Sequence, residues 1–291
     1  MVRGAPAEPG RYCFWPNFSS EKNRNAAGKE NSTMNSRNDK FYSARITLRQ
    51  ELAQDLWKVR LDPGGPFEFV AGQYATLGVR TATKHSERAY SIASSPYEKE
   101  LEIFIELVPE GELTPQLHKL PEGAEVTLRK IAKGRFTLDF KSGHRNHLLL
   151  STVTGVAPFV SYARTLLIDW EENRFPADVH LYLISGASRS WEFGYREELE
   201  GIAKQVPWLA YIPTISRPWE DTAWRGETGR VEDLIRKYAD QWGLTGENTT
   251  AYLCGHPQMI EMGMGILKRR GFSNDSLKQE VYWVPAKSAL S

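Results

Sequence analysis

Hydrophobic and polar residues alternate along much of residues 41–143, the pattern of strands with one buried and one solvent-facing side. Turns rich in Gly and Pro separate the runs. The expected strands are 41–49, 55–61, 69–79, 88–91, 101–108, 125–130 and 135–140, with a short helix at 112–120. Closely spaced strands of this kind predict a small antiparallel β-barrel of six or seven strands, with six the preferred number.

The pattern changes at residue 144, where short apolar runs begin to alternate with longer helical segments. The expected strands are 147–152, 179–185, 209–216, 250–254 and 280–283, and the expected helices are 156–173, 193–205, 231–242 and 258–270. This alternation predicts a doubly wound parallel α/β sheet over residues 144–291. Ligands of such sheets bind at the carboxyl ends of the strands, so the residues that follow each strand are the candidates for function.

Residues 1–40 differ from the rest. They are rich in Asn, Ser, Gly, Arg and Lys and show no hydrophobic periodicity, so we expect a disordered extension. They contain no apolar segment of the kind that a secretory signal requires. No run in the chain approaches the roughly 20 apolar residues of a membrane span. The three expected segments are therefore an extension over 1–40, a barrel over 41–143 and an α/β sheet over 144–291.

The composition narrows the class of protein. Hydrophobic residues make up 41% and charged residues 25% of the 291, as in ordinary globular proteins. The net charge of +1 gives no support for nucleic-acid binding. The two cysteines, Cys13 and Cys254, lie far apart, so we expect neither an iron–sulfur cluster nor a zinc site. A reducing cytoplasm is the expected location, and import into an organelle through residues 1–40 is left open.

The motif Arg88-Ala89-Tyr90-Ser91 carries the first candidate chemistry. On a strand, Arg88 and Tyr90 share one face and Ser91 takes the other, and a twist at the strand end lets all three surround one ligand. A guanidinium suits a phosphate, a phenol ring suits a flat heterocycle, and a hydroxyl can donate to a ring nitrogen. The motif therefore predicts a ligand with a pyrophosphate and a heterocycle. The alternative is an ordinary strand with surface Arg and Ser.

The first strand of the α/β segment is followed by Thr-Val-Thr-Gly-Val-Ala-Pro at 152–158. Small residues after a buried strand let the backbone approach a pyrophosphate at a helix N-terminus. Val153 stands where a first glycine would be, so the motif is not a complete GxGxxG. A simple strand–helix turn is the alternative.

Hydroxyls and arginines follow the next strands. They are Ser188 and Arg189 after the second strand, Ser216 and Arg217 after the third, and Arg230 before the next helix. No acidic residue occupies the tip of the second strand, where a ribose 2′-hydroxyl would require a carboxylate. The arginines therefore predict a site for a 2′-phosphate. Solvated surface charges are the alternative for each arginine alone.

The fourth strand ends in Cys-Gly-His-Pro-Gln-Met at 254–259. Cys254 is expected at the carboxyl edge of the sheet over the ligand crevice, or else as a small buried hydrophobic residue. His256 is interpreted as a loop histidine rather than a base. Near the end of the chain, Tyr282 and Trp283 either pack the last strand or cover a flat ligand. The sequence contains no Ser-His-Asp pattern, no HExxH and no paired carboxylates at a catalytic spacing.

Taken together, these residues resemble the ferredoxin–NADP reductase family in its compact bacterial form. The likeness covers residues 41–283 and rests on seven motifs in the expected order. They are Arg-Ala-Tyr-Ser at 88–91, Pro-Glu-Gly-Glu-Leu-Thr-Pro at 109–115, Thr-Gly-Val-Ala-Pro at 154–158, Ser-Arg at 216–217, Thr-Gly-Arg at 228–230, Cys-Gly-His-Pro-Gln-Met at 254–259 and Glu-Val-Tyr-Trp at 280–283. The chain departs from the family at Val153, which replaces a glycine, at the arginine after the second strand, which is shifted by about one position, and after Trp283, where eight residues follow.

The resemblance implies that the barrel binds FAD and that the α/β segment binds NADP(H). By that likeness, Arg88 contacts the FAD pyrophosphate, Tyr90 lies along the isoalloxazine and Ser91 hydrogen-bonds the N5 region. The full set implied for FAD is Arg88, Ala89, Tyr90, Ser91, Phe104, Glu112, Leu113, Thr114, Thr154, Tyr282 and Trp283. The set implied for NADP is Ser188, Arg189, Ser216, Arg217, Arg230, Gly255, His256, Pro257 and Gln258. The residues implied at the hydride-transfer site are Ser91, Cys254 and Glu280.

The resemblance also implies an activity. The expected protein is an FAD-dependent oxidoreductase that transfers electrons between NADPH and a transiently bound ferredoxin or flavodoxin, as a monomer and without metal or nucleic acid. Two alternatives remain open: an NAD(P)H-dependent free-flavin or quinone reductase, and an electron-transfer subunit of a larger complex. A preference for NADPH over NADH is expected from the arginines after the strands.

Overall fold

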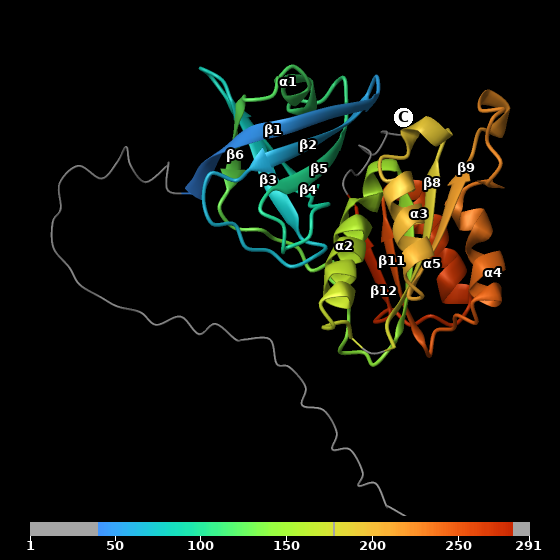
Figure 1. Ribbon diagram of the computed structural model, residues 1–291. Helices are drawn as coiled ribbons and strands as arrows, with labels where there is room; N and C mark the ends of the chain where they lie inside the picture. The colour runs from blue at the N-terminus through green and yellow to red at the C-terminus, as the bar shows by residue number, and fades with distance from the viewer. Residues whose placement is uncertain (1–39, 177, 282–291) are drawn as a thin grey trace, which may run out of the picture. The chain divides into compact units, whose positions relative to one another are not determined.

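The structure is a computed structural model that describes residues 40–176 and 178–281. The extension expected at residues 1–40 therefore lies, apart from Lys40, outside the described residues. In the first half of the described chain, an antiparallel sheet has the strand order β4-β3-β6-β1-β2-β5 (Figure 1). Its strands are β1 (Phe41–Ala53), β2 (Leu56–Asp62), β3 (Tyr74–Arg80), β4 (His85–Ser91), β5 (Leu101–Glu106) and β6 (Glu125–Arg129), with one short helix, α1 (Thr114–His118), between β5 and β6.

The two edge strands of this sheet, β4 and β5, meet and close it into a barrel. Ile92, directly after β4, forms a bridge with Ile103, and the Ala93 N–H donates to the Glu102 carbonyl at 2.8 Å. Alternate residues of β5, including Ile103 and Ile105, point into the barrel core around Trp57. The predicted six-stranded antiparallel barrel is therefore confirmed.

The strand predicted at 135–140 is wrong. The segment is irregular because side chains of the α/β elements take its backbone groups. The Tyr162 hydroxyl donates to the Phe136 carbonyl, and the Asp139 N–H donates to the Tyr252 hydroxyl at 2.8 Å. The Phe136 ring is buried against Phe159, with ring centroids 5.8 Å apart. Apolar alternation here reflects packing against a second element, not pairing in a sheet.

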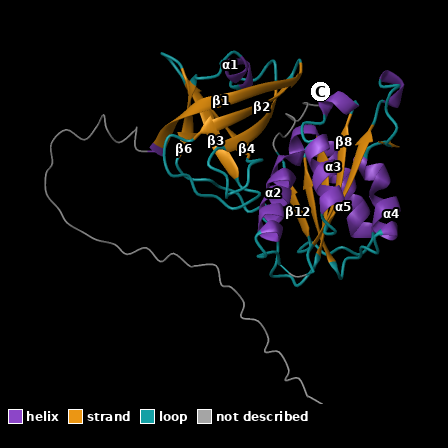
Figure 2. Ribbon diagram, viewed as in Figure 1, coloured by secondary structure: helices purple, strands orange, loops and turns teal. Residues whose placement is uncertain are grey.

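The second half forms a parallel sheet with the strand order β10-β9-β8-β7-β11-β12, which confirms the predicted α/β class. Its strands are β7 (Asn146–Thr152), β8 (His180–Ala187), β9 (Leu209–Ile215), β10 (Glu227–Thr228), β11 (Thr249–Cys254) and β12 (Leu277–Glu280). The helices α2 (Ala157–Glu171) and α3 (Arg196–Gln205) pack on one face, and α4 (Val231–Gln241) and α5 (Pro257–Arg269) pack on the other (Figure 2).

The central strand β7 shows why both faces are covered. Leu149 belongs to the core under α2 and α3, whereas Leu148 and Leu150 belong to the core under α4 and α5. All three are fully buried, so the strand is apolar without interruption, as parallel strands are.

The last strand begins earlier than the sequence predicted. The expectation was a strand at 280–283, but β12 covers Leu277–Glu280, so Glu280 is its last residue. Tyr282 and Trp283 lie outside the described residues. None of the helices in the described part of the chain is both long and apolar enough to cross a membrane.

Stability is expected to fall as the pH drops from 7 to 4, because His147 on β7 is held neutral. Its ring is fully buried, and burial lowers the pKa of His147 to about 4, well below its ordinary value of 6.5. Below pH 6.5, His147 therefore binds a proton in the unfolded state, whereas in the folded state it stays neutral down to about pH 4. This difference corresponds to about 3 kcal/mol of unfolding free energy. Denaturant titrations at several pH values should show a flatter pH dependence for His147→Phe, and equal slopes in both proteins would contradict this prediction.

Candidate active site

Three residues from distant parts of the sequence meet where the barrel approaches the parallel sheet. The Ser91 hydroxyl, at the end of β4, donates to Oε2 of Glu280 at 2.8 Å. Glu280 ends β12 and lies opposite Cys254, the last residue of β11, in the register of that strand pair. Ser91 and Cys254 are buried, the cysteine completely. The predicted trio of Ser91, Cys254 and Glu280 is therefore gathered at one place.

The Glu280 carboxyl has an unusual environment for an acid. Burial raises the pKa of Glu280 above its ordinary value, and the hydrogen bond from Ser91 opposes the rise without cancelling it. A carboxyl with a raised pKa keeps a proton to higher pH than a solvated one does. The Ser91–Glu280 pair can therefore hold and pass a proton beside the strand end.

The loops that follow β7 and β11 are in backbone contact at this edge. A Cβ on Gly155 would lie 2.3 Å from the Cys254 carbonyl oxygen, and a Cβ on Gly255 would lie 2.3 Å from Oγ1 of Thr152. The His256 N–H donates to that same Oγ1 at 2.7 Å. These approaches require glycine at both positions, so the two loops form one narrow cradle of backbone.

Val153 is strained within this cradle. Its φ angle is +44°, a left-handed conformation that a β-branched residue rarely adopts. The position is the one where the family glycine was expected, and the observed φ explains that preference, since glycine adopts it without strain. Thr154 follows in a turn of 3₁₀ helix, Val153–Val156, that leads into α2.

Arg88 and Tyr90 present the features that a large flat anion requires. β4 is an edge strand, and Arg88 and Ala89 are exposed on it. The Tyr90 hydroxyl is buried with no hydrogen-bond partner in the described part of the chain, and burial raises the pKa of Tyr90. A buried hydroxyl without a partner is unfavourable, so a bound ligand with an acceptor would stabilise it. These residues fit an FAD.

The segment before α1 contributes less through its side chains than the sequence suggested. The Thr114 hydroxyl is already bonded to the backbone of Val108, and Leu113 belongs to the barrel core. Glu112 pairs with Lys84 at 2.7 Å, and that hydrogen bond lowers the pKa of the Glu112 carboxyl. The side chains of Glu112, Leu113 and Thr114 are thus already engaged within the barrel.

Phe104 lies elsewhere. Its ring is 4% exposed and packs against Tyr195, with centroids 5.6 Å apart, and it would block a Cβ on Gly194. The strand β5 turns this side chain away from the barrel core and toward the core under α2 and α3. The expectation that Phe104 lines the FAD is therefore corrected, because its ring is enclosed by protein.

Arginines are expected at the carboxyl edge of the parallel sheet, in the loops after β8 and β9 and before α4. This part of the sheet is called the nucleotide edge. The structure places the arginines there, but each has an acidic neighbour. Arg189 binds Glu192 and Glu220, Arg217 lies 3.6 Å from Glu220, and Arg230 lies 4.0 Å from Glu232. The loops after β8 and β9 are also joined by backbone, because the Arg217 N–H donates to the Ser188 carbonyl and the Ser216 N–H to the Ala187 carbonyl, both at 3.0 Å.

The expectation that no carboxylate occupies the tip of β8 is wrong. Oε2 of Glu192 accepts from the Ser188 N–H at 2.8 Å, and Glu220 reaches Arg189 from the loop after β9. Residues 188–191, directly after β8, include no acidic side chain. The structure brings the carboxylates from four residues further on and from a neighbouring loop.

The helix α5 begins at Pro257, just after Gly255, which belongs to the cradle. His256 is the N-cap residue, and its ring accepts from the Gln258 N–H at 3.2 Å. Gly255 has a φ of +129°, and Pro257 occupies the first helical turn, where its missing N–H is harmless. The interpretation of His256 as a loop residue rather than a base agrees with this capping contact.

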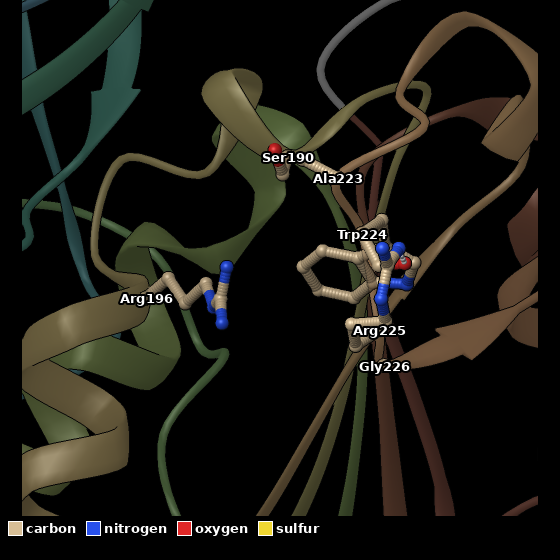
Figure 3. Close-up of a pocket in the computed structure, with 6 residues that line it drawn as sticks. All are labelled: Ser190, Arg196, Ala223, Trp224, Arg225 and Gly226. Atoms are coloured by element: carbon tan, nitrogen blue, oxygen red, sulfur yellow. Dashed lines mark hydrogen bonds between the residues drawn. The ribbon is translucent and has the colours of Figure 1, made fainter.

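A cavity of about 540 Å³ at the nucleotide edge was not foreseen. It is lined by Ser190, Arg196, Ala223, Trp224, Arg225 and Gly226 (Figure 3). The Arg196 guanidinium lies 4.7 Å from the centroid of the Trp224 ring, and Phe193 stacks on the same tryptophan. An aromatic face beside cations suits a ring that carries negative charge. The Trp224-Arg225 pair in the loop after β9 was the available sequence signal.

Comparisons with known proteins agree with this geometry. An oxidoreductase FAD-binding domain model matches residues 43–137, and an oxidoreductase NAD-binding domain model matches residues 149–264. The ferredoxin–NADP reductase of Pseudomonas aeruginosa is 30% identical over 83% of this chain and 98% of its own length. The flavodoxin/ferredoxin–NADP reductase of Escherichia coli is 31% identical over 66% of this chain and 76% of its own length.

The structural comparison supports the same fold. A ferredoxin NADP+ reductase from Neisseria gonorrhoeae, solved with bound FAD and NADP, superimposes with a TM-score of 0.71 over 84% of this chain and 99% of that one, at 24% sequence identity. The resemblance stated from the sequence motifs is therefore confirmed, and so are FAD and NADP as the cofactors.

Proposed function

Because the chain belongs to the ferredoxin–NADP reductase family, we propose that it transfers electrons between NADPH and a small ferredoxin or flavodoxin. The chain is an FAD- and NADP-binding oxidoreductase. The observation that carries the proposal is the hydrogen bond of 2.8 Å between Ser91 of the barrel and Glu280 of the parallel sheet. It joins the end of β4, which is assigned to the flavin, to the carboxyl edge of the parallel sheet, which is assigned to the nucleotide.

The flavin is assigned to the outer end of β4. Bound FAD supplies the hydride and single-electron chemistry of the reaction. Arg88 is exposed to bind the pyrophosphate, and Tyr90 offers its ring and its buried hydroxyl. Ser91 is placed to orient the reactive edge of the ring and to connect it with Glu280. Thr154, in the turn after β7, is also assigned to the flavin.

Ser91 and Glu280 serve as the proton-handling pair. A hydride transfer changes the charge at its acceptor, so a donor already in position lowers the barrier. The Glu280 carboxyl, whose pKa is raised by burial, can keep a proton for that purpose, and the Ser91 hydroxyl can relay it. Cys254 is buried beside them and restricts the space at this edge.

The nucleotide is assigned to the carboxyl edge of the parallel sheet. The backbone cradle of Gly155 and Gly255 accepts its phosphates, and the start of α5 at Pro257 and Gln258 borders its path. Ser216, Arg217 and Arg230 are assigned to the 2′-phosphate. The proposed protein works as a monomer in a reducing cytoplasm and binds its electron partner transiently.

The test begins with the purified protein. A flavin absorption spectrum should be present, and anaerobic NADPH should bleach it. Reduction of cytochrome c by NADPH should be fast only when a ferredoxin or flavodoxin is added. A colourless protein that does not bind added FAD would exclude the proposal. A protein that reduces free flavin or quinone without retaining FAD would instead favour the free-flavin reductase.

A further inference from the structure

Glu220 stands between two of the arginines at the nucleotide edge. Its Oε2 accepts from Nε of Arg189 at 2.7 Å, and its Oε1 lies 3.6 Å from Nη1 of Arg217. Glu220 ends a short 3₁₀ turn, Pro218–Glu220, and its N–H donates to the Arg217 carbonyl at 3.0 Å. The carboxylate is therefore held between the loops after β8 and β9, which carry Arg189 and Arg217.

The arginines are not equally available to a ligand. Arg189 is bound on two sides, by Glu220 and by Nη1 to Oε1 of Glu192 at 2.9 Å, and its side chain is 27% exposed. Arg217 is 48% exposed, and its contact with Glu220 is longer, at 3.6 Å. Arg189 therefore anchors the carboxylate, whereas Arg217 can turn toward a phosphate.

We propose that Glu220 sets the preference of this protein between NADPH and NADH, by competing with the 2′-phosphate for Arg217 and by accepting a hydrogen bond from the 2′-hydroxyl when no phosphate is present. The proposal rests on the proposed function, because it assigns the nucleotide to this edge.

NADPH carries a phosphate at the ribose 2′ position and NADH a hydroxyl, and this difference explains the two roles proposed for Glu220. A ribose 2′-hydroxyl is a donor and is recognised in dinucleotide-binding folds by a carboxylate, whereas a 2′-phosphate is recognised by arginine. Glu220 and Arg217 provide both groups at one place. To bind the phosphate at Arg217, the protein must give up the Glu220 contact and place two negative groups near each other. The carboxylate therefore lowers the affinity for NADPH and supports binding of NADH.

The experiment uses the FAD-loaded protein and the variant Glu220→Gln. A glutamine retains an acceptor for Arg189 and removes the negative charge. Calorimetry with 2′-AMP, which carries the phosphate, should give a dissociation constant roughly fivefold lower in the variant, the scale of one partly exposed ion pair. The dissociation constant for 5′-AMP, which carries a 2′-hydroxyl, should stay the same or rise. The ratio of kcat/KM for NADPH to that for NADH should rise through KM, with kcat unchanged.

Glu172→Gln is the matched control. Glu172 also pairs with an arginine, Arg174, and both side chains are about half exposed, but they lie at the end of α2. The control should leave both affinities unchanged. The effect of Glu220→Gln should shrink at high salt, because exposed charges are then screened.

The outcomes separate this inference from the proposed function. If Glu220→Gln tightens 2′-AMP and 5′-AMP equally, leaves the ratio of kcat/KM unchanged or weakens 2′-AMP, the inference is overturned while NADPH oxidation by the unaltered protein still stands. If the unaltered protein binds neither nucleotide and is not reduced by NADPH, the assignment of the edge itself fails, and the inference with it.

Discussion

Replacement of Ser91 by alanine is expected to leave FAD bound and to slow its reduction by NADPH by ~10² to 10³, the usual effect of losing one well-placed hydrogen-bond donor. Ser91 lies at the end of β4 and is almost completely buried, and its hydroxyl donates to Glu280 at 2.8 Å. Arg88 and Tyr90, which are assigned to hold the flavin, are unchanged in this variant. The flavin spectrum should therefore persist while the reduction rate falls, and stopped-flow absorbance under anaerobic conditions measures that rate.

Ser86 provides a matched control on the same strand. It is also buried on β4, and its hydroxyl has no hydrogen-bond partner within residues 40–176 and 178–281. Ser86→Ala removes the same atom without removing a donated bond, so flavin content and reduction rate should both stay near normal. A near-normal rate in Ser91→Ala would contradict the role of Ser91, and an equal loss in both variants would point to damage to β4 instead.

Glu280→Gln tests the other member of the pair. The amide can still accept from Ser91, but it does not titrate. Because burial raises the pKa of the Glu280 carboxyl, the pH dependence of flavin reduction in the unaltered protein should lie above the range of an ordinary carboxyl. The variant should lose that pH dependence while keeping the flavin.

The sequence predicted the elements well where each residue's environment is set by its own strand or helix. Leu148, Leu149 and Leu150 form an uninterrupted apolar run because both faces of β7 are covered, and that run is visible without the structure. The strand end at Ser91 was also predictable, because Arg, Tyr and Ser at this spacing suit one kind of ligand. Cys254 was expected at the carboxyl edge from its place after the fourth strand, but its pairing with Glu280 at the hydride-transfer site came from the resemblance, since the parallel pairing of β11 with β12 brings them together.

The sequence-based predictions that were wrong share a physical cause. A strand was wrongly predicted at 135–140 because the hydroxyls of Tyr162 and Tyr252 bond to the backbone of this segment, and those residues lie far along the chain. The carboxylate at the tip of β8 was missed because Glu220 arrives from another loop. Phe104 was misassigned because β5 faces two cores and the sequence does not say which residue faces which. Long-range contacts decide each of these, and no local pattern records them.

Replacement of Arg164 by methionine is expected to destabilise the protein by about 3 kcal/mol, the lower end for breaking a buried ion pair. Arg164 on α2 is 13% exposed and binds Glu102 of the barrel at 2.9 Å and Glu198 of α3 at 2.6 Å. Without it, Glu102, whose side chain is 5% exposed, keeps the ion pair with Arg60 at 2.8 Å but loses the charge of its buried partner. The melting temperature, measured with saturating FAD, should fall by roughly 6–12 °C.

The pH dependence of that loss identifies its cause. Burial alone would raise the pKa of Glu102, but the charge of Arg164 and the hydrogen bond from Arg60 outweigh it, so that the pKa is lowered. The contribution of the pair is therefore fully present above the ordinary carboxyl pKa and is lost as the pH falls below it. The difference in melting temperature between Arg164→Met and the unaltered protein should hold from pH 7 down to the ordinary carboxyl pKa of 4.5 and narrow below it. A difference that is constant with pH would indicate lost packing instead of an unpaired charge.

A second change should restore much of the stability. In Arg164→Met with Glu102→Gln, the carboxylate that would be left unpaired is absent, so the double variant should be more stable than Arg164→Met alone. Arg174→Met is the control, because Arg174 is 48% exposed and its pairs with Asp169 and Glu172 contribute little. If the double variant is less stable than Arg164→Met, Glu102 contributes through Arg60 rather than Arg164. If Arg174→Met loses as much as Arg164→Met, burial of the pair is not what makes Arg164 important.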